Sequence, residues 1–307
     1  MALKKKNIII VNPMAGNGSA AQTWKKLAPK ISFLGSYDEM FSAYAGHITQ
    51  LTRDALKAGA QRILIVGGDG SLTEALNGFF ENDDPIHETA ILGTIPMGTG
   101  SDFLKSFGLK NREEVIGQLE KEHIQLCDVG RVTYTTESGA SVSKLFLNIA
   151  SFGCSGEIVN RVHRSDKRFG AKLTYLGAMA SAFLTYKNPE VDIECDEKEK
   201  TTVKINNVFI CNGKYSGGGM CWGPKASVSD RKFDITIVKN IPKLTGILHM
   251  NKIYNGTVLE MEGIAFKRCS TLKASSKQKI PIEVDGDITG YLPATFQIYS
   301  HPIRFWY

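Results

Sequence analysis

Three glycine-rich stretches of the chain combine residue types that can hold a phosphate group. Each follows a short apolar run, and they read NPMAGNG (residues 12–18), GGDGS (67–71) and PMGTGSD (96–102). Glycine lets backbone N–H groups approach a ligand closely, and a helix starting just beyond adds unpaired N–H groups and a positive dipole end. One such loop is often only a tight turn, but three together favour a phosphate-binding site.

Asp69 stands among three glycines, where bound phosphate would repel its carboxylate unless a cation or a transferable proton lay between them. Holding Mg²⁺ through water, or orienting an acceptor hydroxyl, would use this charge. The structural alternative is that Asp69 caps a helix that we expect to begin at Ser71, since Asp is a favoured N-cap residue. Both roles can hold together, but capping alone does not explain the flanking glycines.

A dinucleotide-binding enzyme competes with this interpretation. Residues 16–21 (GNGSAA) nearly fit the G-x-G-x-x-G/A fingerprint, and the acidic residues Asp38 and Glu39 follow about twenty positions later. Against it, residues 12–15 separate the preceding strand from Gly16, whereas the fingerprint places its first glycine directly after the strand. A Walker A motif is absent from the sequence.

The first third of the chain alternates strand and helix patterns, and these elements must position the loops. The expected strands and helices are residues 8–11 (strand), 20–30 (helix), 37–44 (strand), 47–58 (helix), 63–66 (strand), 71–80 (helix) and 90–95 (strand). This βαβα order predicts a mostly parallel sheet covered by helices on both faces. Ligands of such sheets bind beyond the carboxyl ends of the strands, where the glycine-rich loops fall.

From about Cys127 the pattern changes to strands separated by polar turns, which predicts a second, β-rich domain with helical insertions. The strands expected there include residues 129–135, 143–149, 191–195, 203–211, 233–238 and 295–299, and the helices 156–164, 172–186 and 243–254. We therefore predict a first domain over residues 1–127 and a second over 128–292. The tail, about 293–307, is expected to pack on the fold and return to the first domain, with an interfacial aromatic anchor as the alternative for its last three residues.

The bulk composition is that of an ordinary globular protein, with 307 residues, 42% apolar and 22% charged. No stretch approaches the roughly 20 apolar residues of a membrane span, and the N-terminal apolar run is better explained as a buried strand than as a signal peptide. The six cysteines lack metal-site spacing, which favours a reduced, cytoplasmic protein. A net charge of +6 suits an anionic partner without choosing among nucleotide, nucleic acid and acidic membrane.

Blocks along nearly the whole chain resemble the motifs of the diacylglycerol kinase catalytic family, which is related to sphingosine kinases and, more distantly, to NAD kinases. Gly67-Gly68-Asp69-Gly70-Ser71, with Glu74 and Asn77-Gly78 after it, resembles the block G-G-D-G-T-x-x-E-x-x-N-G. The other matching blocks are residues 12–16, 96–103, 128–130, 146–153, 217–230 and 285–287. The small size and the lack of C1-type zinc modules are similar to the stand-alone bacterial lipid kinases.

The resemblance implies an ATP- and Mg²⁺-dependent kinase that phosphorylates a hydroxyl of a membrane lipid such as diacylglycerol. It implies an α/β domain and a β-sandwich-like domain with helical insertions, with the active site in a cleft between them. By position, Asp287 is the base near the acceptor hydroxyl, Asp69 takes part in catalysis and places Mg²⁺ through water, and Asp230 matches a structural metal ligand. The positions implied in nucleotide binding are Asn12, Pro13, Gly16, Gly67, Gly68, Asp69, Gly70, Ser71, Glu74, Gly98, Thr99, Gly100, Asp102 and Asp128.

Three positions depart from the family pattern. Ser101 replaces an asparagine, Arg231 replaces the glycine of the metal loop, and Asp287 is one methylene shorter than the usual glutamate. A displacement of about 1 Å can lower a rate by roughly 10²-fold, so weakened activity or an unusual acceptor is an open alternative. Without the resemblance, Asp285-Gly286 would be interpreted as a type I′ hairpin turn.

We expect a cytoplasmic protein that associates peripherally with the membrane. Its expected partners are a membrane lipid and an anionic membrane surface, and no nucleic acid is expected. A basic cluster could contact acidic headgroups, or it could be a solvated helix face. Its members are Arg161, Arg164, Lys167, Arg168 and Lys172. A homodimer is compatible with the sequence, which leaves the oligomeric state open. An NAD kinase and a nucleotide- or lipid-binding protein without turnover stay as rival functions.

Overall fold

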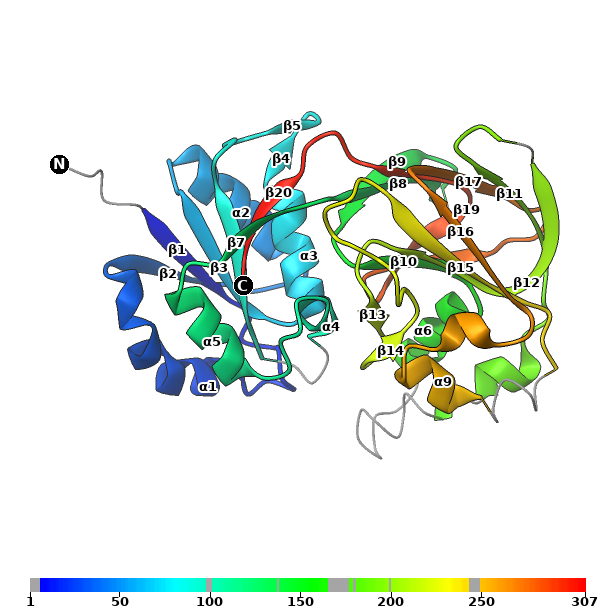
Figure 1. Cartoon of the computed structure of the whole chain (residues 1–307). Helices are drawn as coiled ribbons and strands as arrows, with labels where there is room; N and C mark the ends of the chain where they lie inside the picture. Colours follow the sequence, from blue (N-terminus) through cyan, green and yellow to red (C-terminus); the bar gives the residue numbers. More distant parts are fainter. Residues whose placement is uncertain are drawn as a thin grey trace. The chain divides into compact units, whose positions relative to one another are not determined.

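The structure is a computed structural model that describes residues 6–97, 101–136, 138–164, 177–178, 181–198, 200–242 and 249–307. The chain forms two compact units, which are treated separately below (Figure 1). Unit 1 comprises Met1–Val129 and Tyr299–Tyr307, and unit 2 comprises Gly130–Ile298. The unit boundaries thus fall at Val129 and Ile298. The boundaries predicted from the sequence were near residues 127 and 292.

Unit 1 is built on a six-stranded sheet in the order β2-β1-β3-β6-β20-β7. All neighbouring pairs are parallel except β20–β7, so the predicted mostly parallel sheet is confirmed. Its strands are β1 (Asn7–Val11), β2 (Tyr37–Phe41), β3 (Arg62–Gly67), β6 (Ile91–Pro96), β7 (Ile124–Cys127) and β20 (Ile303–Trp306). β1, β3 and β6 are buried along their whole length because helices cover both faces, which explains their continuous apolar runs.

The helices of unit 1 form two groups, one on each face of the sheet (Figure 1). α2 and α3 pack against each other, while α1 and α5 both contact the 3₁₀ helix η1. Their bounds, with those of the short elements, are α1 (Ala20–Leu27), η1 (Ala28–Leu34), α2 (His47–Lys57), α3 (Asp69–Gly78), β4 (Phe80–Glu81), β5 (Asp84–Pro85), α4 (Asp102–Lys105) and α5 (Arg112–Glu120). The expected helix 20–30 therefore ends earlier as an α-helix, because Pro29 lies in the first turn of η1.

The end of the chain is the strand β20, which lies between β6 and β7. Trp306 is buried and its indole N–H donates to the carbonyl of Leu119 at 3.0 Å. The ring of Phe305 meets that of Phe103 edge-on, with centroids 5.0 Å apart. The terminal aromatics are thus part of the core of unit 1 and not an interfacial anchor.

Unit 2 is a ten-stranded sheet whose longest path runs β10-β18-β19-β17-β11-β12-β15-β16. A further pairing of β10 with β12 closes β10, β18, β19, β17, β11 and β12 into a ring around the main core of this unit. The expected β-rich second domain is therefore confirmed. The sheet strands are β8 (Gly130–Thr135), β9 (Ser141–Phe146), β10 (Ile149–Gly153), β11 (Glu190–Cys195), β12 (Thr201–Cys211), β15 (Phe233–Lys239), β16 (Ile264–Cys269), β17 (Thr271–Ser275), β18 (Pro281–Val284) and β19 (Asp287–Ile298).

Among its described residues, unit 2 also has helices and a small hairpin. They are α6 (Cys154–Arg164), β13 (Tyr215–Ser216), β14 (Met220–Cys221), α9 (Met250–Tyr254) and the 3₁₀ helix η3 (Val258–Glu260). The expected helices 172–186 and 243–254 lie partly outside the described residues, although 181–185 is helical. Among the described helices, none has the length and apolar character needed to cross a bilayer.

One predicted strand is wrong, because residues 143–149 do not form a single strand. β9 ends at Phe146 and β10 begins at Ile149, with Leu147 and Asn148 between them. The backbone N–H groups of Leu147, Asn148 and Ile149 point to the carboxylate of Asp285, at 3.2, 3.2 and 3.0 Å. A long-range carboxylate therefore turns the chain at a place where the local apolar pattern continues.

Candidate active site

The loops after β1, β3 and β6 meet at one edge of the sheet in unit 1. The side-chain amide of Asn12 donates to the hydroxyl of Ser71 at 2.9 Å, which joins the first loop to the start of α3. Gly16 has φ +59°, and a Cβ there would lie 2.5 Å from the carbonyl oxygen of Met97, so the first and third loops touch where only glycine fits. Pro13 is partly buried in the same first loop.

The positions of β1 and β3 give this edge a second property. From β1 the chain crosses to β2 on one side, whereas from β3 it crosses to β6 on the other side. This reversal of direction is a topological switch point, and ligands of open α/β sheets bind outside the carboxyl ends of the strands at such a point. The loops 12–18 and 67–71 are the two that flank it.

Asp69 is the first residue of α3, so the helix begins two residues before the predicted start at Ser71. The N-cap position itself is Gly68, so Asp69 is not the N-cap residue of α3. The two carboxylate oxygens of Asp69 accept from the backbone N–H groups of Asp102, at 3.1 Å, and Phe103, at 3.4 Å, which are the first residues of α4. Asp69 therefore ties the second loop to the third by holding the N-terminus of another helix.

The glycines of the second loop fall into two kinds. A Cβ on Gly67 would lie 2.6 Å from the side chain of Ser71, so packing requires glycine at this position. A Cβ on Gly68 or Gly70 would meet no atom within 4 Å among the described residues. Gly68 also has φ −102° and ψ −174°, which any residue can adopt. Neither the backbone conformation nor the packing of the described residues requires glycine at position 68, and these residues leave open space beside it.

Other predicted binding residues have partners within unit 1. Glu74 accepts from the backbone N–H of Ile48 at 3.3 Å and thereby holds the start of α2. Asp102 is buried and pairs with Lys105 at 2.6 Å. Asp128 is also buried, and its charge adds to the burial that raises the pKa of the neighbouring Cys127 thiol. Glu74 therefore fixes the start of α2, and Asp102 pairs with a lysine of its own helix α4. The predicted residues Gly98, Thr99 and Gly100 lie outside the described residues.

In unit 2, Asp285-Gly286 forms the turn of the β18–β19 hairpin. Both residues have positive φ, 48° and 96°, as a type I′ turn requires. The Asp285 carboxylate accepts the three amides between β9 and β10 described above. Asp287 follows the turn with 60% of its side chain exposed and lies 3.6 Å from the ammonium of Lys144.

Glu283, two residues before the turn, was not predicted as a site residue. Its carboxylate accepts from the hydroxyl of Ser151 at 2.5 Å and from the backbone N–H of Gly286 at 2.8 Å. Ser151 in turn lies 2.7 Å from the hydroxyl of Ser155 at the start of α6. Burial raises the pKa of the Glu283 carboxyl above its ordinary value, although the hydrogen bond from Ser151 acts in the opposite direction. The only sequence signal was its place beside the Asp285–Asp287 block.

Asp230, the position implied for a structural metal, is instead engaged with an arginine. A terminal guanidinium nitrogen of Arg268 donates to the carboxylate of Asp230. The Nε atom of the same arginine lies 3.3 Å from the buried carboxylate of Asp234. Arg231 has φ +61°, so the loop keeps the backbone conformation that glycine favours. No group of three or more His, Cys, Asp or Glu side chains that could hold a metal occurs among the described residues. The residues around Asp230 do not fit a metal ion.

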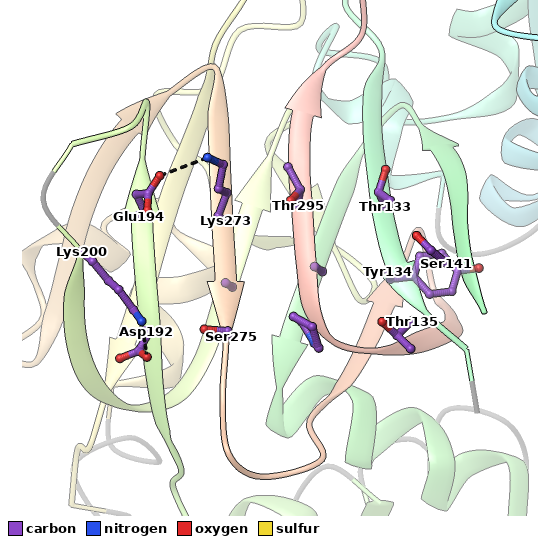
Figure 2. Close-up of a pocket in the computed structure, with 13 residues that line it drawn as sticks. Thr133, Tyr134, Thr135, Ser141, Asp192, Glu194, Lys200, Lys273, Ser275 and Thr295 are labelled. Carbon is purple, nitrogen blue, oxygen red and sulfur yellow. Dashed lines mark ion pairs between the residues drawn. The ribbon is translucent and has the colours of Figure 1, made fainter. Parts of the chain in front are cut away.

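A hollow of about 440 Å³ lies on unit 2, lined by residues of β8, β9, β11, β17 and β19 (Figure 2). Lys273 lies 3.3 Å from Glu194, and Lys200 lies 2.8 Å from Asp192. The lining charges are therefore paired with each other, and the hollow contains none of the predicted site residues. Of the basic cluster, Arg161 pairs with Glu157 at 2.8 Å, while the side chains of Arg164, Lys167, Arg168 and Lys172 lie outside the described residues.

Comparisons with known proteins match both units. The family described as "Diacylglycerol kinase catalytic domain" matches residues 6–132, and that described as "YegS C-terminal NAD kinase beta sandwich-like domain" matches residues 148–305. Diacylglycerol kinase of Bacillus subtilis is 25% identical over 97% of this chain and 95% of its own length. Diacylglycerol kinase of Mycobacterium tuberculosis is 24% identical over 93% of this chain and 89% of its own length. The crystal structure of a diacylglycerol kinase from Bacillus anthracis has the same fold, with a TM-score of 0.71 and 20% identity over 99% of this chain and 97% of that one.

Proposed function

The chain belongs to the diacylglycerol kinase catalytic-domain family, and from that premise we propose that it is an ATP-dependent lipid kinase. It transfers the γ-phosphate of ATP to a hydroxyl of a membrane lipid such as diacylglycerol, giving a phosphomonoester and ADP. Lipid kinases are the relatives that match nearly the whole chain. The family therefore supports the reaction class, and the geometry of the loops supports the nucleotide.

The observation that carries the proposal is the open space beside Gly68 and Gly70 at the N-terminus of a ten-residue helix. The N-cap residue Gly68 contributes no side-chain cap to the amides of the first turn. These amides carry the positive end of the helix dipole and suit a phosphate group. A methyl group at either glycine would enter the space that the phosphate needs. The site also lies at the switch point of the sheet, where this fold binds ligands.

Phosphoryl transfer requires that the phosphate chain be held in line and its charge be neutralised. In the proposed reaction the amides beside Gly68 bind the phosphates, Asn12 holds Ser71 in place, and Asp69 keeps the second and third loops together. ATP supplies the transferable phosphoryl group. The residues of this site suit Mg²⁺ that arrives with the nucleotide, since Mg²⁺ usually keeps several waters and binds through phosphates and one or two carboxylates. Asp69, with its oxygens turned to the third loop, can reach such an ion through water.

The proposed acceptor places the enzyme at a membrane surface, as a cytoplasmic protein that associates peripherally. The net charge of +6 favours an anionic surface, and Arg161 is the described member of the basic cluster that would contribute. Nucleic acid is not a proposed partner, and a homodimer is compatible with these roles.

The experiment is an assay of ADP release and lipid phosphorylation with MgATP and detergent micelles that contain dioleoylglycerol, with sphingosine and NAD as competing acceptors. Wild type should phosphorylate a lipid and leave NAD unchanged. Gly68→Ala should keep its melting temperature and raise the KM for ATP by roughly tenfold or more, because the methyl group displaces a phosphate. Gly117→Ala is the matched control, since a Cβ at Gly117 of α5 also meets no atom within 4 Å. Phosphorylation of NAD alone, or an unchanged KM in Gly68→Ala, would contradict the proposal.

A further inference from the structure

Two carboxylates of unit 2 converge on one guanidinium group. Asp230 lies in the loop before β15, and Asp234 belongs to that strand. Arg268, on the neighbouring strand β16, is the register partner of Asp234, so these two side chains stand directly opposite each other on one face of the sheet. A terminal nitrogen of Arg268 contacts Asp230, and its Nε lies 3.3 Å from Asp234. The guanidinium therefore connects the loop with the two strands.

Asp234 is a carboxylate in surroundings that disfavour a charge. Its side chain is 1% exposed. Its strand neighbours Phe233 and Ile235 belong to the main core, so Asp234 points to the opposite face of β15, where its register partner Cys211 belongs to a second apolar cluster. Among the described residues, no hydrogen bond reaches either carboxylate oxygen of Asp234. A buried charge of this kind requires a cation beside it.

Arg268 is the cation whose contact with Asp234 the structure shows. Burial raises the pKa of Asp234 to about 6, and Arg268 opposes this rise more strongly than Lys225 or Lys214 does. The ammonium of Lys225 lies over the ring of Phe266, 5.4 Å from its centroid. The charge of Asp234 is therefore balanced mainly by the guanidinium on the neighbouring strand.

The loop that carries Asp230 turns one oxygen of its carboxylate to the same guanidinium. The backbone N–H of Lys232 donates to Oδ1 of Asp230 at 3.1 Å, while Oδ2 faces Arg268. Carboxylate oxygens from two segments thus face a single centre of positive charge. A hard divalent cation asks the same of a protein, because Mg²⁺ binds through one or two carboxylates and keeps several waters.

We propose that Arg268 is a built-in cation that takes the place of a divalent metal ion between Asp230 and Asp234. Its guanidinium neutralises the two carboxylates and fastens the loop to β15 and β16, so unit 2 needs no metal there. This explains why the residues around Asp230 do not fit a metal ion, although the resemblance implies a metal ligand at that position. Without the guanidinium, the two carboxylates become a donor set for Mg²⁺ or Ca²⁺. The inference concerns unit 2 alone and does not rest on the kinase function.

A second ion cluster in unit 2 provides a matched control. Lys273 on β17 is the register partner of Glu194 on β11, and its ammonium lies 3.3 Å from Glu194 and 3.9 Å from Glu197. This is also a cross-strand cation beside two carboxylates. The side chains of Glu194 and Glu197 are, however, 29% and 84% exposed, so water solvates them and no cation is required. Lys273→Ala should therefore create no response to metal.

The test measures thermal unfolding of the full chain without ATP or lipid, in EDTA, MgCl₂ or CaCl₂ at constant ionic strength. Wild type and Lys273→Ala should change their melting temperatures by less than about 1 °C in about 10 mM of either metal. Arg268→Ala should gain about 2 °C or more, because the metal binds the native state and not the unfolded chain. Isothermal titration calorimetry should show a divalent-cation site in Arg268→Ala that wild type lacks.

A double variant that combines Asp234→Asn with Arg268→Ala supplies the second measurement. It removes the buried charge together with its cation, so it should melt above Arg268→Ala in EDTA and show no response to metal. If Arg268→Ala folds only when metal is added, the inference is supported. It is overturned if Arg268→Ala folds but ignores both metals, if it folds in none of the solutions, or if the double variant gains as much from metal as Arg268→Ala does.

Discussion

Asp69 in unit 1 and Asp285 in unit 2 are both aspartates beside glycine, and both lie in blocks that resemble the family pattern. In the structure each turns its carboxylate to backbone amides of a segment far along the chain, two for Asp69 and three for Asp285. The difference lies in their glycines. Gly286 has positive φ because the hairpin needs it, whereas Gly68 has an ordinary backbone and open space beside it. An aspartate–glycine pair can therefore hold two segments together in one place and border a proposed nucleotide site in another.

Of the substitutions that distinguish the Asp69 region from the Asp285 region, Asp285→Ala is expected to have the largest effect, which is on stability. This change leaves three amides between β9 and β10 without their acceptor, and each loss of a charged partner costs about 1 kcal/mol or more. We expect the free energy of unfolding of unit 2 to fall by about 3 kcal/mol or more, measured by urea denaturation. Asp285→Asn keeps one acceptor oxygen and should lose about half as much. A loss under about 1 kcal/mol for Asp285→Ala would show that the turn, and not the carboxylate, orders this region.

Compared with Asp285→Ala, Asp69→Ala should lower the free energy of unfolding less and the kinase activity more. Two amides at the start of α4 lose their acceptor, and one of these contacts is long, at 3.4 Å, so the stability loss from them should be about 1–2 kcal/mol. Phosphorylation of the lipid should nevertheless drop by at least roughly 10²-fold, because the second and third loops lose their link and the proposed Mg²⁺ would lose a nearby carboxylate. Circular dichroism and the kinase assay check the two expectations. Full activity in a folded Asp69→Ala protein would remove Asp69 from the site.

Asp230 and Asp234 differ from Asp69 and Asp285 because a side chain, that of Arg268, contacts their carboxylates. Burial raises the pKa of Asp234 to about 6, and Arg268 opposes this rise. Because this folded pKa exceeds the unfolded one, the native state binds more protons, and this group makes wild type less stable as pH rises from about 4 to 6. Arg268 stabilises mainly the ionised form, so Arg268→Ala should cost about 1 kcal/mol at pH 8 and less at pH 5. Thermal unfolding at both pH values measures this difference.

A matched measurement with metal completes that test. Since Asp230 pairs with Arg268, adding MgCl₂ or EDTA should leave the melting temperature of wild type unchanged. Arg268→Lys keeps the charge and should restore part of the stability lost in Arg268→Ala. A clear rise of the wild-type melting temperature with Mg²⁺ in the absence of ATP would contradict this account of the loop.

Much of unit 1 could be predicted because its signals are local. The buried runs of β1 and β3 are apolar at every position, and the glycines after them mark the strand ends. β7 and β18 were missed because their short strands carry polar residues and depend on long-range partners. The prediction of a continuous strand over residues 143–149 was wrong for a related reason. The local sequence gives no sign that the carboxylate of Asp285 binds the amides of this segment.

The amino-acid sequence by itself determined the alternation of strands and helices, the three glycine-rich loops and the family to which the chain belongs. These properties depend on residue type and spacing along the chain, which the backbone expresses locally. Only the tertiary structure decided which partner each of these acids contacts. It committed Asp285 to amides and Asp230 to Arg268, and it placed Glu283 and Asp287 on opposite faces of one hairpin. The contacts of a carboxylate depend on the strand register and on partners distant in sequence, which exist only once the chain has folded.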